Sequence, residues 1–131
     1  MIALALLLQA TAPSAASIAP PRVAEWTALP PLPLGGRLPE GEALSAFVKA
    51  EVGAGRCAAP LVDTTGTSHL SVDMAVLVDR TGAVRRMIPR AIACPTVEQY
   101  AVGIATRIAR GNVTPPAADG WFRLTMPFAW R

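Results

Sequence analysis

The sequence is poor in the side chains from which catalytic and metal sites are usually built. It holds one histidine and two cysteines in 131 residues, fewer than the usual ligand set of a structural zinc site. The histidine, His69, has no evident carboxylate partner other than Asp73, and a Gly-rich phosphate-binding loop is missing. We therefore predict that the protein is not an enzyme and that it has no catalytic residues, no metal site and no cofactor.

Lysine is nearly absent, and the chain is only mildly basic. Lys49 is the only lysine beside eleven arginines, and the formal net charge is +3. Nucleic-acid-binding domains gather basic residues on one surface and interleave them with aromatic residues. The only local concentration of basic residues is formed by Arg85, Arg86 and Arg90, so we expect no nucleic-acid partner.

The apolar run at residues 1–10 is far shorter than the roughly 20 residues that cross a bilayer as a helix, but it has the length of a signal peptide. Small residues follow at 14–16, and we predict a signal peptide over residues 1–16 that is cleaved after Ala16. Export to the periplasm or to the medium would follow. The alternatives are a buried N-terminal helix and an uncleaved anchor, which is the only membrane contact that we foresee.

The two cysteines, Cys57 and Cys94, are predicted to form a disulfide, because the compartments beyond the inner membrane are oxidising. In the chain-entropy model, a loop of this length contributes at most about 4 kcal/mol of stability. That amount is large for so small a core. Two free buried thiols and a redox pair are the alternatives, and the C-x-x-C spacing of thiol oxidoreductases is missing.

Proline is concentrated in the segment after the predicted cleavage site. Six prolines lie between Ala19 and Pro39, where they remove backbone donors and favour extended polyproline geometry. We interpret residues 17–39 as a Pro-rich tether, and a Pro-rich ligand for a recognition module is the alternative. The folded domain is then predicted to span residues 40–131.

Hydrophobic periodicity predicts five elements downstream of the tether. Apolar residues recur at helical spacing in two segments and alternate with a period of two in three others. The predicted elements are a helix over 40–53, strands over 70–78 and 83–92, a helix from Thr96 to Gly111, and a strand over 121–130. This order predicts an α+β, two-layer fold, in which a three-stranded antiparallel or mixed sheet carries both helices on one face.

This element order, together with three sequence segments, resembles the C-terminal domain of the TonB/TolA family. The segments are Val-Asp-Arg-Thr-Gly-Ala-Val at 78–84, Cys-Pro-Thr-Val-Glu-Gln-Tyr at 94–100 and the closing Trp-Phe-Arg-Leu-Thr-Met-Pro-Phe-Ala-Trp. The likeness covers about residues 40–131 and implies that the last strand lies at a sheet edge. There it would bind an extended peptide of an outer-membrane receptor by strand addition. The short apolar run and the short tether differ from TonB proper, so energy transduction is not implied.

The resemblance places the binding site on the last strand. The predicted binding residues are Trp121, Arg123, Thr125 and Trp130, with packing as the alternative role of the two tryptophans. The expected partner is an envelope protein or a receptor peptide, and a second copy of the chain is an alternative partner. The alternative functions are a small disulfide-stapled envelope inhibitor or stability factor and, less favoured, a thiol-redox protein.

The position of Pro127 affects whether the last strand can accept an added peptide strand. Its missing N–H lies on the same edge of the last strand as the N–H groups of Arg123, Thr125 and Ala129. If that edge faces outward, Pro127 weakens the addition of a peptide. If it faces the neighbouring strand, a bond is lost inside the sheet and the outer edge stays open.

Overall fold

The computed structural model of the chain describes residues 19–39 and 41–131, so the predicted signal peptide over 1–16 lies outside the described residues. The elements follow one another as η1 (Val23–Ala28), α1 (Glu42–Gly53), β1 (Leu61–Val62), β2 (Ser68–Val78), β3 (Val84–Pro89), α2 (Pro95–Ala109) and β4 (Gly120–Trp130). None of the described helices combines the length and the apolar character that crossing a membrane requires.

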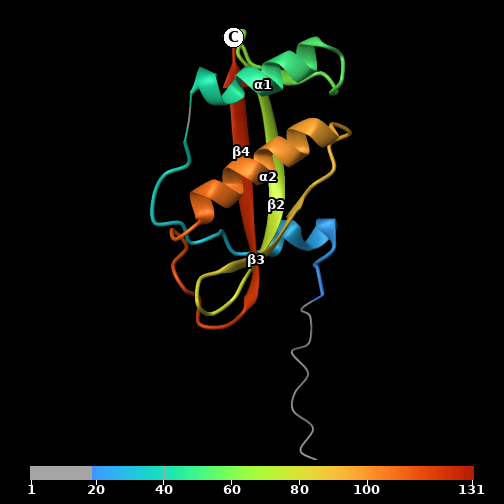
Figure 1. Ribbon diagram of the computed structural model, residues 1–131. Helices are drawn as coiled ribbons and strands as arrows, with labels where there is room; N and C mark the ends of the chain where they lie inside the picture. The colour runs from blue at the N-terminus through green and yellow to red at the C-terminus, as the bar shows by residue number, and fades with distance from the viewer. Residues whose placement is uncertain (1–18, 40) are drawn as a thin grey trace, which may run out of the picture.

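The sheet is antiparallel, and β2 is its central strand (Figure 1). On one side β2 pairs with β4 along its whole length, from Ser68 opposite Trp130 to Val78 opposite Gly120. On the other side β2 pairs with β1 near its start and with β3 near its end. The predicted antiparallel arrangement is therefore confirmed, with β1 as a fourth strand that the sequence did not predict.

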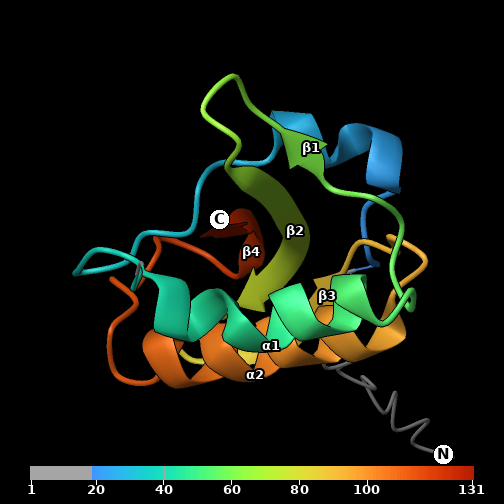
Figure 2. The ribbon, with the colours of Figure 1, turned by 90° about the horizontal axis from the view of Figure 1, so that it is seen from above.

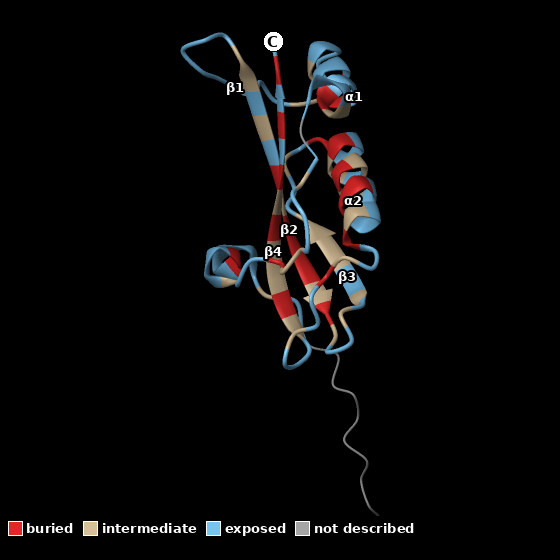
Figure 3. Ribbon diagram, turned by 90° about the vertical axis from the view of Figure 1, so that its left-hand side faces the viewer, coloured by how far each residue is buried: buried red, intermediate tan, exposed pale blue. Residues whose placement is uncertain are grey.

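The two long helices lie on one face of the sheet, as predicted. Figures 2 and 3 show α1 and α2 together on one side, whereas the short η1 lies on the other side. The α+β, two-layer prediction is thus confirmed, and η1 adds a small cover to the second face. The period of two along the strands explains this division, since successive side chains of a strand point to opposite faces.

Each face of the sheet carries its own apolar cluster. The main cluster joins even-numbered residues of β2 and β4, among them Met74 and Phe128, to the apolar stripe of α2, and Val97 and Ile104 are buried in it. The second cluster contains the buried residues Trp26, Ala75 and Trp121, with Leu29, Leu77 and Ile88 packed around them. The helices thus cover the larger core, and η1 covers the smaller one through Trp26.

Helix α2 begins earlier than predicted. Its N-cap is Cys94 and Pro95 is its first residue, whereas the sequence pattern predicted a helix that starts at Thr96. Oε2 of Glu98 accepts the backbone N–H of Cys94 at 3.0 Å. Proline at the first position of a helix loses no hydrogen bond, which explains why the helix starts there.

The Cys57–Cys94 disulfide is present, as predicted. It joins the loop after α1 to the start of α2, and Cys94 is fully buried. Beside it, the buried Glu51 of α1 accepts hydrogen bonds from Nη1 of Arg56 at 3.0 Å and from Oγ1 of Thr96 at 2.7 Å. A covalent and a polar link therefore hold the two helices and the intervening loop at the same place.

Part of the segment interpreted as a tether packs against the domain. Residues 30–34, called the strap from here on, cross the outer edge of β4, and Pro31 forms a parallel bridge with Arg123. Leu32 is 7% exposed and belongs to the main cluster. The described contacts of the folded unit therefore start upstream of residue 40.

We predict that removal of the disulfide destabilises the domain. The Cys57→Ala/Cys94→Ala variant should lose up to about 4 kcal/mol in its free energy of unfolding, because its unfolded chain is no longer cross-linked. Urea unfolding followed by circular dichroism measures the loss. The natural chain under a reductant that keeps both thiols free is the control and should approach the variant. Equal unfolding midpoints of variant and oxidised chain would show that the bridge adds no stability.

Candidate binding site at the edge of β4

The backbone hydrogen bonds of Arg123 show which way its side of β4 faces. Its N–H donates to the carbonyl oxygen of Pro30 at 2.8 Å, and its carbonyl oxygen accepts the N–H of Leu32 at 2.8 Å. Backbone groups alternate in direction along a strand, so those of Thr125, Pro127 and Ala129 lie on this same edge, away from β2. The edge that carries Pro127 therefore faces outward, and Pro127 removes a backbone donor from it.

The positions along this edge differ in what they offer to a partner. Arg123 is occupied by the strap, and the N–H of Ala129 donates to Oγ of Ser45 at 3.0 Å. Ser45 lies on α1 and is only 2% exposed. Pro127 offers its carbonyl oxygen alone. Among the described residues, the N–H of Thr125 has no hydrogen-bond partner, so Thr125 to Ala129 forms an open stretch with one free donor.

A groove of about 420 Å³ lies beside the C-terminal end of this open stretch. Residues 127–131 form one wall, and the start of α1, with Glu42 and Ser45, forms another. His69 and Ser71 of β2 also line it, because they lie beside the small residues Ala129 and Pro127 in the sheet register. The groove therefore extends from the start of α1, past residues 127–131 of the chain, to the side chains of β2.

The four predicted binding residues do not form one surface. Trp121 is 9% exposed and packs in the second cluster, whereas Trp130 is 8% exposed and packs in the main cluster on the opposite face. Arg123 and Thr125 lie on the edge, on the same face as Trp121, and Oγ1 of Thr125 donates to Oδ1 of Asp73 at 2.6 Å. Packing, the alternative role of the tryptophans, is the role that the structure gives both side chains.

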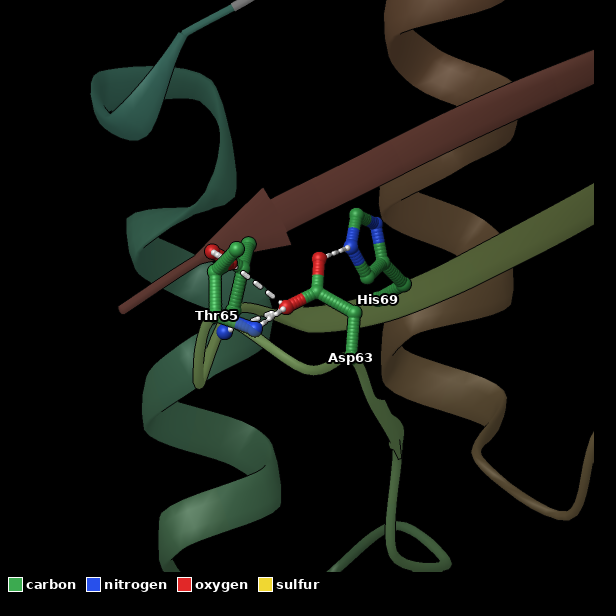
Figure 4. A network of polar contacts seen from close by, with 4 residues as sticks. Asp63, Thr65 and His69 are labelled. Atoms are coloured by element: carbon green, nitrogen blue, oxygen red, sulfur yellow. Dashed lines mark hydrogen bonds and ion pairs between the residues drawn. The ribbon is translucent and has the colours of Figure 1, made fainter.

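The structure pairs His69 with Asp63, a contact that the sequence reasoning missed. Oδ2 of Asp63 lies 2.7 Å from Nε2 of His69 across the hairpin between β1 and β2 (Figure 4). Oδ1 of Asp63 accepts the backbone N–H of Thr65 at 2.8 Å and its hydroxyl at 2.6 Å. The expectation that His69 has no carboxylate partner other than Asp73 was therefore wrong, since the hairpin turn brings Asp63 back beside the histidine.

The same arrangement recurs in the next hairpin. Oδ1 of Asp79 accepts the backbone N–H groups of Thr81 and Ala83, and its Oδ2 lies 2.6 Å from Nε of Arg85. Both loops follow the pattern Asp-x-Thr-Gly-x-x followed by a basic residue, at 63–69 and at 79–85. This repeated pattern is the sequence signal that could have revealed the Asp63–His69 pair.

Hydrogen bonding lowers the pKa of both loop carboxyls. The hydroxyl of Thr65 is the main cause for the lowered pKa of Asp63, followed by His69. The hydroxyl of Thr81 is the main cause for the lowered pKa of Asp79, with Arg85 as a further cause. Because each carboxyl binds a proton less readily in the folded than in the unfolded chain, it stabilises the fold above its unfolded pKa. That stability is lost as the pH falls below about 4.

We predict that Thr81→Val raises the pKa of Asp79, because valine keeps the shape and the backbone N–H but removes the hydroxyl donor. Carboxyl titration followed by NMR measures the change, and Asp63 in the same variant is the internal control.

In Asp79→Asn, the loss of thermal stability relative to the natural chain should be present at pH 7 and should shrink as the pH falls from 4 to 2. A loss that is constant over this range would contradict the assignment.

In comparisons with known proteins, no family model, no curated protein and no solved structure matches this chain, and the resemblance to the TonB/TolA C-terminal domain stays a prediction.

Proposed function

We propose that the chain is a non-enzymatic protein-binding domain of the cell envelope, located in the periplasm or outside the cell. Its partner is an envelope protein or a receptor peptide, of which an extended segment adds to the outer edge of β4. The resemblance to the TonB/TolA C-terminal domain led to this function, and the geometry of the edge supports it.

The pairing of the strap with Arg123 is the observation that carries the proposal. An extended segment already sits on this edge and forms two backbone hydrogen bonds of 2.8 Å with Arg123. The edge is therefore flat enough and accessible enough to pair with an added strand. Exposed edges of this kind recruit extended peptides through their unpaired backbone groups.

The open stretch and its groove supply the place for the partner. Next to the strap, the edge presents the N–H and C=O of Thr125 and the C=O of Pro127. The groove beside residues 127–131 gives room for side chains of the added segment. A partner segment would thus combine backbone pairing at Thr125 with side-chain contacts in the groove. In strand addition, the backbone hydrogen bonds supply the affinity and the side-chain contacts supply the specificity.

The disulfide supports the envelope location, because such bridges persist in oxidising compartments. The thiol-redox alternative is less favoured, because the C-x-x-C spacing is missing and Cys94 is fully buried, which leaves Cys57 as the one partly exposed sulfur. The inhibitor or stability factor stays the alternative function, because a fold alone does not determine a function.

We predict that Thr125→Pro abolishes partner capture, whereas Thr125→Val preserves it. Both variants lose the hydroxyl bond to Asp73, but only proline removes the free outward N–H of the open stretch. Crosslinking in the native envelope, followed by quantitative mass spectrometry, should show at least tenfold less captured partner for Thr125→Pro. Thr125→Val should stay within about twofold of the natural chain.

Circular dichroism of both variants checks that the fold is kept, and proline is tolerated at an outward-facing edge position, as at Pro127. Equal capture by the two variants and the natural chain would refute binding through the β4 edge.

A further inference from the structure

The strap pairs with the outer edge of β4 at Arg123 only and leaves the edge from Thr125 onward uncovered. After Leu32 has donated to Arg123, its own carbonyl oxygen accepts the N–H of Leu34 at 2.9 Å, in a tight turn centred on Pro33. The chain then leaves β4, and Leu34 pairs with Val113 instead. In a straight parallel ladder the carbonyl oxygen of Leu32 would meet the N–H of Thr125.

We propose that the strap is a displaceable occupant of the β4 edge. The partner segment takes its place and continues parallel to β4 as far as Pro127. This inference rests on the proposed function, because it concerns the same edge. A straight segment would use the groups of Arg123 that the strap uses, and it would add the N–H and C=O of Thr125 and the C=O of Pro127. The partner therefore gains backbone bonds that the strap leaves unmade.

The ladder geometry defines the chemical class of the partner segment. It must carry an N–H at the place of Leu32 and at the second and fourth residues after that place, because these donors face β4. It needs an apolar side chain at the place of Leu32, which is 7% exposed in the main cluster. Proline is permitted at the places of Pro31 and Pro33, where the backbone nitrogen points away from β4.

Displacement of the strap must break its contacts with the rest of the domain. The N–H of Gly35 donates to the carbonyl oxygen of Asn112, and the N–H of Thr114 donates to that of Pro33, both at 2.8 Å. Upstream, Trp26 holds η1 on the second face. The strap is joined covalently to the domain and competes at a high effective concentration, so weakening it should raise the affinity for a partner.

Hydrogen exchange tests the displacement without any partner. In the full-length natural chain, the amide of Arg123 should exchange at least tenfold faster than the amide of Val76 inside the β2–β4 ladder. Leu32→Ala should accelerate Arg123 at least another tenfold and leave Val76 unchanged, because only the strap opens. If Arg123 and Val76 exchange at one common rate in the natural chain, the strap belongs to the cooperative fold and the proposal is overturned. This comparison stands even where Leu32→Ala fails to fold.

A peptide tests the direction and the extent of pairing. The probe is a labelled peptide of residues 28–36 with Pro33→Val, which removes the proline at the centre of the turn. It should bind the Leu32→Ala chain at least tenfold more tightly than the natural chain and should protect the amides of both Arg123 and Thr125. The matched control peptide is N-methylated at Leu32 and lacks the donor, so it should bind at least tenfold more weakly.

Equal binding of the probe to both chains, equal binding of the N-methylated peptide, or an unprotected Thr125 would each overturn the inference. Failure of the proposed function has a different signature. Capture from the envelope would then be insensitive to Thr125→Pro, while the exchange rates of Arg123 and Val76 would still report whether the strap opens.

Discussion

The ladder between β2 and β4 is the interaction on which the rest of this structure depends. It pairs the two strands over their full lengths, and it thereby sorts every side chain of β4 onto one of two faces. Even-numbered residues enter the main core under α1 and α2, and odd-numbered residues face η1 or solvent. The same register turns the backbone groups of Arg123, Thr125, Pro127 and Ala129 outward, so the core and the candidate site have one origin.

Much of the fold was predictable because its elements have strong local signals. The hairpin between β2 and β3 follows from Asp79 and Gly82, since Gly82 has a φ of 84° and an added Cβ would lie 2.9 Å from the carbonyl oxygen of Val113. Strand β1 was missed because Leu61 and Val62 are too few to show a period. The strap was missed because its contacts join segments far apart in sequence, and its prolines read equally well as a tether.

The candidate site was predictable only in part. Parity along the last strand identified which backbone groups share an edge with Pro127, but it left open which side β2 occupies. Side-chain type suggested Trp121 and Trp130 as binding residues, yet their alternation placed them in packing positions on opposite faces. The role of Ser45 had no signal in the sequence, because its bond to Ala129 depends on how α1 crosses the end of β4.

Prolines remove backbone donors from both outer edges of this sheet. Pro127 lies on the outer edge of β4, and Pro31 and Pro33 point their nitrogens away from it. On the opposite edge, Arg90 donates to the carbonyl oxygen of Asp73, so alternation turns Pro89 outward from β3 as well. Missing donors discourage indiscriminate pairing of edges, which natural sheets must prevent. Among the described residues, the N–H of Thr125 is the one unpaired donor between the strap and Pro127. A stretch of edge with a single free donor can discriminate among extended segments, because only a segment with its acceptor at that point completes the pairing.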